Sequence, residues 1–261
     1  MTLKLQVTAL THPGLVREHN EDAIAVGGWF APGVMTAPYQ TVLDLSDVVV
    51  CLVADGLGGH AGGEIASALA VSRLSAAPHE LLSEEALQQA IRGVSDEIVQ
   101  RASAEPALRG MGTTLVGVVA RETVGVMVNV GDSRAYCWEG GYLGQLSVDD
   151  SLNGQGTSHI VTQSLGGGQH LPAPRPHLVP LALRLGDRYL LCSDGLTDYA
   201  SLDVLEKCMT RNEDRAAAQG LFEAALAGGG GDNVSLLLLR VLDQQRGLEP
   251  PTHMDRRGAA L

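Results

Sequence analysis

Five aspartates stand at the ends of segments that have the composition of buried β-strands. Asp55 follows the apolar run VVVCLVA, and Asp232 precedes NVSLLLL. In an antiparallel sheet the end of one strand lies beside the start of its neighbour, so such carboxylates can converge on one rim. Like charges brought close raise one another's pKa and destabilise the fold unless a cation compensates them. The five, which together predict a cation site, are Asp22, Asp55, Asp132, Asp194 and Asp232.

Turn chemistry is the alternative explanation for each aspartate taken alone, because Asp followed by Gly, Ser or Asn is common in turns. Five such residues at strand ends are harder to explain in that way. Oxygen ligands without nearby clusters of Cys and His select Mg2+ or Mn2+ over zinc. The glycines beside Asp55 and Asp194 leave room for backbone carbonyls or metal-bound waters to complete the coordination.

The composition is that of a globular protein with a sizeable core, since 45% of the 261 residues are hydrophobic. A net charge of -12 argues against a nucleic-acid binder and suggests a cation as partner. No apolar run approaches the roughly 20 residues that span a bilayer, and the start lacks a signal-peptide pattern. The four cysteines show no CxxC spacing. We therefore expect a cytoplasmic protein with reduced structural thiols.

Two kinds of segment must position these aspartates, short β-branched strands and a few amphipathic helices. Tight turns such as ARET and WEGG join the strands, which favours antiparallel sheets packed together with helices outside. We predict strands over 4–10, 22–26, 48–54, 113–119, 123–130, 133–138, 188–192 and 234–241. We predict helices over 64–75, 83–103, 202–211 and 213–227.

The domain organisation is predicted as one domain over 1–242 followed by a loose tail over 243–261, which contains two adjacent prolines. Residues 27–47 have the composition of an irregular insertion. Thr113 and Thr114 are expected to pack in a central strand, and Glu64 to start a helix, where its charge suits the helix dipole.

Seven motifs in one order are far more specific than any aspartate alone. They are RxxNED (Arg17, Asn20, Glu21 and Asp22), ADGLGGHAGGE, GMGTT, GDSR, SLGG, CSDGLTD and GDNVS. In these motifs and their order the chain, from Val7 to Val241, resembles the protein phosphatases of type 2C. The resemblance implies an α+β fold, a four-layer α/β/β/α sandwich of two antiparallel sheets flanked by helices. It also implies an enzyme that hydrolyses phosphoserine and phosphothreonine with Mn2+ or Mg2+.

The resemblance implies a two-metal centre, with a third and weaker metal site in bacterial members. Asp55 resembles the carboxylate that bridges both metals, and Gly56 the residue that gives its backbone carbonyl. Asp194 and Asp232 resemble the other direct ligands. Asp22 is similar to the acidic residue that holds metal-bound water, and Asp132 to the residue of the third site.

Arg17 resembles the phosphate-binding arginine of the family, and its planar fork suits two phosphate oxygens at once. A surface salt bridge with Glu18 or Glu21 is the alternative. Two cations that share a water lower its pKa from about 15.7 toward neutrality. The implied mechanism is in-line attack by a metal-bridging hydroxide while the metals and Arg17 absorb charge, so Asp55 and Arg17 are the candidate catalytic residues.

The chain departs from the family pattern at two places. Leu57 stands where eukaryotic members often have a histidine that is proposed as general acid, and His60 nearby is more easily read as a structural residue at a helix entry. The flap segment after GDSR is short and has Asp150 where a histidine is usual. The histidines in or after this segment, expected to be exposed loop residues, are His159, His170 and His177.

Partners follow from the same resemblance. We expect a monomer that acts on phosphoproteins and opposes a cognate Ser/Thr kinase. Short-flap bacterial members include phosphatases encoded with type VI secretion systems, and this chain is a candidate for that group. Two other functions are weighed: a catalytically silent regulator, which would be expected to have lost an acidic ligand, and a two-metal nucleotide hydrolase. The low aromatic content of 3% makes the second less attractive.

Overall fold

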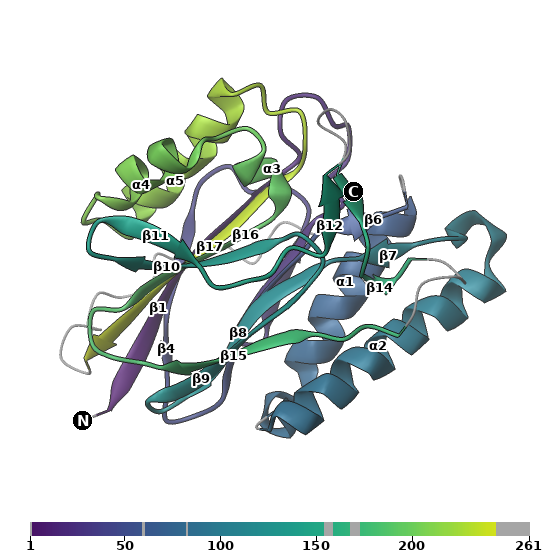
Figure 1. Ribbon diagram of the computed structural model, residues 1–261, viewed down its shortest axis with the longest axis horizontal. Coiled ribbons are helices and arrows are strands. Elements are labelled where there is room, and N and C mark those ends of the chain that lie inside the picture. Colours follow the sequence, from purple (N-terminus) through teal and green to yellow (C-terminus); the bar gives the residue numbers. More distant parts are fainter. Residues whose placement is uncertain (1, 59–60, 82, 154–158, 168–172, 244–261) are drawn as a thin grey trace, which may run out of the picture.

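The computed structural model describes residues 2–58, 61–81, 83–153, 159–167 and 173–243. Its centre is a pair of six-stranded antiparallel sheets that pack face to face (Figure 1). The first sheet has the strand order β11-β10-β16-β17-β1-β4. Its strands are β1 (Leu3–His12), β4 (Tyr39–Asp44), β10 (Arg134–Glu139), β11 (Tyr142–Gln145), β16 (Arg188–Cys192) and β17 (Val234–Asp243).

The second sheet has the strand order β15-β9-β8-β5-β2-β3. Its strands are β2 (Ala23–Val26), β3 (Trp29–Pro32), β5 (Val49–Ala54), β8 (Leu115–Arg121), β9 (Val124–Val130) and β15 (His177–Ala182). β5 is buried at every position. Such a strand reads as a continuous apolar run, because both of its faces are covered.

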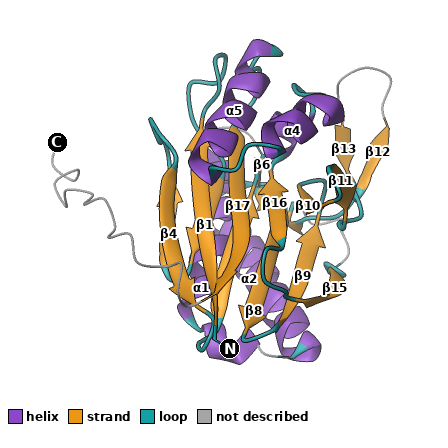
Figure 2. Cartoon of the chain, turned by 90° about the vertical axis from the view of Figure 1, so that its left-hand side faces the viewer, coloured by secondary structure: helices purple, strands orange, loops and turns teal. Residues whose placement is uncertain are grey.

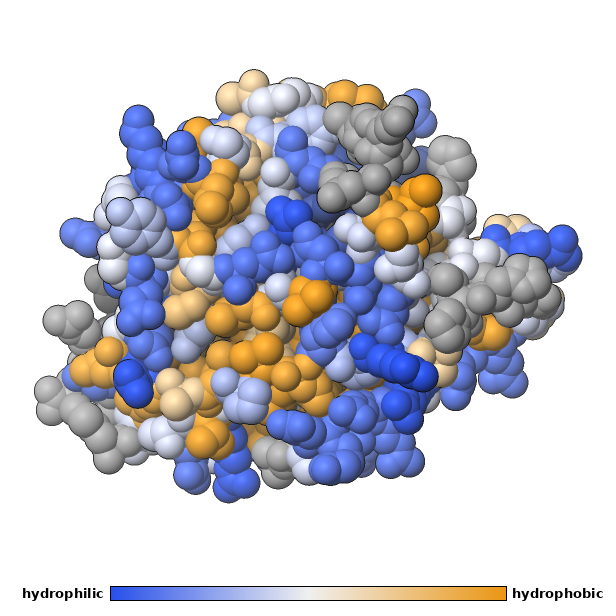
Figure 3. Space-filling model, in the orientation of Figure 1, coloured by the Kyte–Doolittle hydropathy of each residue, from blue (hydrophilic) through white to orange (hydrophobic). Residues whose placement is uncertain are grey.

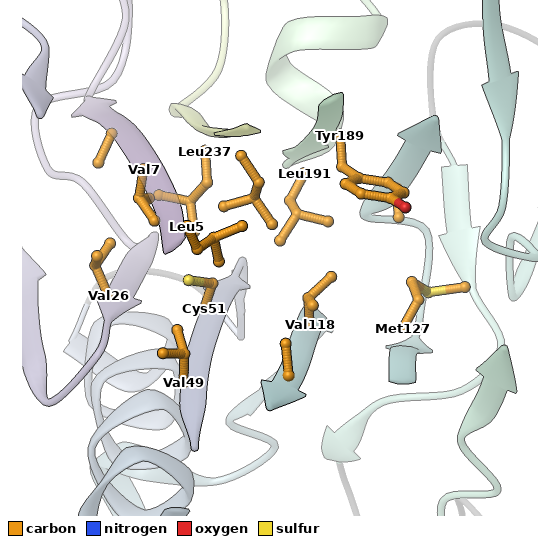
Figure 4. Close-up of a cluster of buried hydrophobic side chains, with 14 of the residues drawn as sticks. Leu5, Val7, Val26, Val49, Cys51, Val118, Met127, Tyr189, Leu191 and Leu237 are labelled. Atoms are coloured by element: carbon orange, nitrogen blue, oxygen red, sulfur yellow. The ribbon is translucent and has the colours of Figure 1, made fainter. Parts of the chain in front are cut away.

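The interior between the two sheets is a single apolar cluster (Figure 4). Val7 and Leu237 of the first sheet meet Cys51 and Val118 of the second, and all four are buried. On the face shown in Figure 3, apolar surface gathers between β10 of the first sheet and β15 of the second. Partly buried hydrophobic residues such as Leu146 and Val179 pack against the central cluster.

Helices cover the outer face of each sheet, which makes four layers (Figures 1 and 2). α1 (Ala61–Ala76) and α2 (Glu84–Ala104) pack on the second sheet, with two short 3-10 helices (Pro78–Leu81 and Pro106–Leu108) beside them. α3 (Asp194–Thr197), α4 (Leu202–Met209) and α5 (Asp214–Ala227) pack on the first. Ser83 caps α2 by accepting a hydrogen bond from the Ala86 N–H, so the predicted start is confirmed. The predicted α/β/β/α sandwich is likewise confirmed.

Two small sheets lie near the end of the sandwich that carries the aspartates. β6 (Gly56–Leu57), β7 (Gly112–Thr113) and β14 (Leu165–Gly166) form one of them. β12 (Ser151–Asn153) and β13 (His159–Val161) form the other, a hairpin that we call the flap hairpin (Figure 2).

Three expectations need comment. The prediction of an irregular insertion over 27–47 was wrong, because this segment supplies the edge strands β3 and β4. The aromatic pair Trp29 and Tyr39 stacks there, with ring centroids 4.9 Å apart. The tail predicted over 243–261 lies outside the described residues except for Asp243, which ends β17. Among the helices that the structure describes, none combines the length and apolar composition that crossing a bilayer requires.

Candidate metal centre

A cleft of about 120 Å³ opens where the strand ends meet, and four of the five predicted aspartates line it. The strand pairing explains this convergence. Ala23 at the start of β2 lies opposite Ala54 at the end of β5, so Asp22 and Asp55 are brought together. The lining residues are Arg17, Glu21, Asp55, Gly56, Leu57, Asp132, Val161, Asp194, Asp232 and Asn233.

Asp22, the fifth aspartate, is fully buried beneath the cleft. Its Oδ2 accepts a hydrogen bond from Ser193 Oγ at 2.8 Å, and its backbone N–H donates to Asn20 Oδ1 at 3.2 Å. Within the described residues, Oδ1 of Asp22 and Oδ1 of Asp194 are buried and have no hydrogen-bond partner. A buried carboxylate oxygen without a donor is costly unless something else satisfies it.

The electrostatics of Asp22, Asp55 and Asp194 are strongly perturbed. Burial raises the pKa of Asp22 to about 6, with a smaller contribution from the charge of Asp232. Burial, with the charge of Asp132, raises the pKa of Asp194 to about 7. Burial and the charges of Asp22 and Asp194 raise the pKa of Asp55 well above its usual range. Near neutral pH these groups are therefore costly to hold in the charged form, a cost that a cation would offset.

The oxygen atoms at the cleft suit a hard divalent cation, but they are not arranged as a complete coordination shell. Among the described residues, no group of three or more His, Cys, Asp or Glu side chains has the arrangement of a ready-made metal site. One reason is visible at Asp232, whose Oδ2 accepts from Arg17 and whose Oδ1 accepts from the Asn233 N–H, both at 2.8 Å. The unsatisfied oxygens of Asp22 and Asp194 and the carboxylate-rich lining still match what Mg2+ and Mn2+ prefer.

The backbone of Asp55 is held by the two threonines of the GMGTT motif. Thr114 Oγ1 accepts a hydrogen bond from the Asp55 N–H at 3.0 Å, and Thr113 Oγ1 donates to the Asp55 carbonyl at 2.8 Å. Thr114 Oγ1 also shares a 2.7 Å hydrogen bond with Ser133 Oγ, one residue after Asp132. The expectation that these threonines only pack in a strand missed this role. Two adjacent hydroxyls in a buried motif were the available signal.

Gly56 is held where no side chain fits. It pairs with Thr113 in the small sheet, and a Cβ atom at this position would collide with the backbone of Gly63 and the carbonyl of Glu21. The glycine next to Asp55 is therefore required by the close approach of the α1 entry to the cleft. α1 begins at Ala61, and Glu64 lies in its first turn, near the helix start expected for it.

Arg17 reaches across the cleft mouth to the last predicted ligand. Its Nη2 lies 2.8 Å from Asp232 Oδ2, and 54% of its side chain is exposed. The salt bridge of Arg17 seen in the structure is therefore with Asp232, whereas the alternative placed it with Glu18 or Glu21. The guanidinium keeps its fork at the cleft entrance, where an incoming anion would meet it.

Asp132 lies between the main cleft and a second small cavity. This cavity, of about 10 Å³, is lined by Asp132, Arg134, Asp149, Ser151, Asp194, Thr197 and Asp198. Arg134 holds Asp149 through two N–H donors, with Nη2 at 2.6 Å and Nε at 2.9 Å from Asp149 Oδ2. Asp132 thus lies close to Asp194 and lines both cavities, on the side of the flap hairpin.

The histidines have different places. His60 and His170 lie outside the described residues, and His159 begins β13. His177 was predicted as an exposed loop residue, but it lies in β15, and its Nε2 is 2.9 Å from Asp150 Oδ1. That prediction was wrong, because the strand was hidden by Pro176 and Pro180 in the sequence.

Comparison with known proteins agrees with the motifs. The profile of the family described as "Protein phosphatase 2C" matches residues 39–227, more than half of the chain. The serine/threonine phosphatase stp of Listeria innocua is 33% identical over 260 residues, covering 91% of this chain and 96% of that protein. The serine/threonine protein phosphatase PstP of Mycobacterium tuberculosis is also 33% identical, over 96% of this chain, and the chain spans 48% of that longer protein.

Solved structures give the same answer for the fold. The catalytic domain of PstP in complex with two manganese ions superposes with a TM-score of 0.74 at 32% identity, covering 93% of this chain and all of that chain. PppA of Pseudomonas aeruginosa, described as a key regulatory component of the type VI secretion system, has a TM-score of 0.73 at 29% identity, covering 91% of this chain and 98% of that chain. With the matched profile, these likenesses show that the chain belongs to the protein phosphatase 2C family.

Proposed function

We propose that this chain is a metal-dependent serine/threonine protein phosphatase. One observation carries the proposal: buried carboxyl groups with raised pKa values and unsatisfied oxygens stand at the foot of a cleft whose mouth carries Arg17. Relatives with these motifs are named serine/threonine phosphatases, and one neighbour holds two manganese ions. The described residues include every carboxylate that the family pattern requires.

The proposed residues divide the work by position. Asp55, the backbone carbonyl of Gly56, Asp194 and Asp232 would hold two Mn2+ or Mg2+ ions, with Asp22 behind them. Asp132 would serve a third and weaker site. When bound, the cations lower the pKa of a water molecule and offset the charge of the phosphoryl group.

The other groups of the cleft bind and orient the substrate. Arg17 is placed to donate to two oxygens of a phosphoryl group, because its exposed fork lies at the cleft mouth. Leu57 and Val161 are the apolar side chains of the lining and limit water on that side. None of the described residues in the lining is a histidine, and we propose that the leaving oxygen takes its proton from solvent.

The test is phosphate release from a phosphothreonine peptide by the purified protein, with EDTA and with millimolar Mn2+, beside Asp194→Asn. Release that requires Mn2+ and is lost in the variant supports the proposal. Mn2+ binding without release from any phosphopeptide would favour the silent regulator. Faster release from nucleotides than from phosphopeptides would favour the nucleotide hydrolase.

The finer parts of the proposal concern the setting of the enzyme. We propose a cytoplasmic monomer whose phosphatase domain spans 1–242 and that opposes a cognate Ser/Thr kinase. The similarity to PppA supports a role beside a type VI secretion system. Light scattering would test the monomer, and deletion of the gene, followed by phosphoproteomics, would identify proteins that gain phosphate.

A further inference from the structure

Asp150 forms hydrogen bonds with both backbone polar groups of Gly131, the residue that precedes Asp132. The Asp150 N–H donates to the Gly131 carbonyl at 2.9 Å, and the Gly131 N–H donates to Asp150 Oδ2 at 3.0 Å. Gly131 has a φ of 97°, a conformation that L side chains rarely adopt. Asp150, 18 positions after Asp132, therefore holds the turn that carries Asp132 through both backbone groups of Gly131, and Asn129 Nδ2 adds a longer hydrogen bond of 3.4 Å to the same carbonyl.

The same carboxylate reaches two other elements. Gln163 Nε2 donates to Asp150 Oδ2 at 2.7 Å, just beyond the flap hairpin. His177 Nε2, in β15, lies 2.9 Å from Asp150 Oδ1. The Asp150 carbonyl accepts the Thr162 N–H at 2.7 Å, which ties it to the residue after Val161, the flap residue in the cleft lining.

The residue type explains why one position can hold three elements. A carboxylate is an acceptor with two oxygens and about four lone-pair sites, whereas a neutral imidazole accepts one hydrogen bond. Asp150 accepts from Gly131, Gln163 and His177 at once, with 14% of its side chain exposed. A histidine at this position, as in the family pattern, could not accept all three.

We propose that Asp150 is a positioning residue of the metal centre, with His177 as its partner. It fixes the Gly131–Asp132 turn relative to the flap hairpin that carries Val161. It thereby sets the orientation of the Asp132 carboxylate toward a bound cation and the position of the apolar cleft wall. This inference rests on the proposed phosphatase function, because Asp132 is taken as a metal-binding residue.

The experiment compares Asp150→Asn with His177→Gln, His177→Ala and the exchange variant Asp150→His/His177→Asp. Asp187→Asn is the matched control, because Asp187 also accepts a backbone N–H in a turn, from Arg184, and is absent from the cleft lining. Mn2+ binding is measured by calorimetry on each protein, and the Mn2+ dependence of p-nitrophenyl phosphate hydrolysis is measured beside it. Melting temperatures in EDTA report on the fold.

We expect Asp150→Asn to raise the Mn2+ concentration that half-fills the third, weaker site by about tenfold, as is typical when a residue that orients a metal ligand is replaced. His177→Gln keeps a donor and is expected to stay within about twofold, and His177→Ala to fall between the two. The exchange variant should recover part of the loss. Asp187→Asn should match the wild type.

Two results would overturn the inference. The first is a Mn2+ binding curve of Asp150→Asn that superimposes on that of the wild type. The second is a lower melting temperature in EDTA with unchanged Mn2+ dependence, which would make Asp150 purely structural. A wild-type protein that binds Mn2+ but hydrolyses nothing would refute the proposed function alone, because the calorimetric comparison would still decide the role of Asp150.

Discussion

Acidic side chains are buried in two regions of the molecule, and these regions differ in the partners that the chain supplies to the buried carboxylates. Asp214, at the start of α5, is 1% exposed and accepts hydrogen bonds from Arg188 at 2.7 Å and Arg240 at 2.6 Å. Gln6 Nε2 donates to the same carboxylate at 2.9 Å. The chain itself thus supplies this buried acid with two cations and a neutral donor.

Asp22 and Asp194, at the cleft, are compensated less completely within the described residues. Among the described residues of the cleft lining, Arg17 is the one Lys or Arg, and its contact is with Asp232 at the mouth. Asp22 and Asp194 each keep a buried oxygen without a hydrogen-bond partner in the described chain. Burial of an acidic side chain is therefore not in itself a sign of function. A buried acid that the fold leaves uncompensated is the informative one.

The largest expected effect is on catalysis at the cleft. Asp55→Asn removes the carboxylate whose pKa is raised by burial and by the charges of Asp22 and Asp194, and a metal centre contributes several kcal/mol to such a reaction. We expect phosphopeptide hydrolysis to fall by on the order of 10³-fold or more. Circular dichroism should show a retained fold, since one buried charge is removed. Substantial turnover by this variant at saturating Mn2+ would contradict the centre.

The second effect is on stability at the compensated acid. Asp214→Ala leaves two arginines without their partner, and breaking such a buried pair costs about 3–5 kcal/mol. The free energy of unfolding in urea should fall by that amount, while the folded fraction keeps its Mn2+ affinity. A loss of Mn2+ affinity as large as that of Asp55→Asn would remove the distinction between the two regions.

A third effect concerns pH and metal together. The folded-state pKa values of Asp22 and Asp194 are raised to about 6 and about 7. Their contribution to the free energy of unfolding is therefore fully present below the unfolded pKa of about 3.9 and is lost as pH rises through about 7. In EDTA, these groups should make the protein less stable at pH 7.5 than at pH 5.

Divalent cations should reverse this loss, because they bind the charged carboxylates. Mn2+ at about 100 times its dissociation constant contributes about 2.7 kcal/mol, and in a domain of this size we expect about 5–10 °C at pH 7.5. The increment at pH 5 should be much smaller. Thermal scans with EDTA and with Mn2+ at both pH values measure it, and Asp194→Asn should flatten the difference. An equal increment at both pH values would exclude these carboxyl groups as the titrating sites.

Sequence reasoning predicted the parts of the fold whose signals are local. The continuous apolar runs of β5 and β16 reveal buried strands, and the aspartates after them follow from antiparallel pairing. The edge strands β3 and β4 were missed, because they are short and prolines and glycines stand beside them in the sequence. Edge strands are defined by their neighbours in space more than by their own residues.

The candidate site also combines features that local sequence signals predict with contacts that depend on neighbours in space. The motifs identified which residues gather at the cleft, but not how deep each one lies or what it touches. The partner of Arg17 is 215 positions away in the sequence, and that of Asp150 is in a strand that was not predicted. The adjacent hydroxyls of the GMGTT motif indicate a polar role, but spacing along the chain does not say which groups Thr114 contacts.

The smallest expected effect tests whether the cleft depends on its backbone support as well as on its charges. Thr114→Val keeps the volume but leaves the Asp55 N–H and the Ser133 hydroxyl without this partner. Unsatisfied buried groups cost roughly 1–3 kcal/mol. We expect urea unfolding to show a loss in that range, and Mn2+ affinity to weaken because Asp55 is less well held. Thr114→Ser keeps the hydroxyl, so it should retain most of the Mn2+ affinity. If Thr114→Val lowered stability but left Mn2+ affinity unchanged, the support would serve the fold alone, and the uncompensated carboxyl groups would suffice to define the centre.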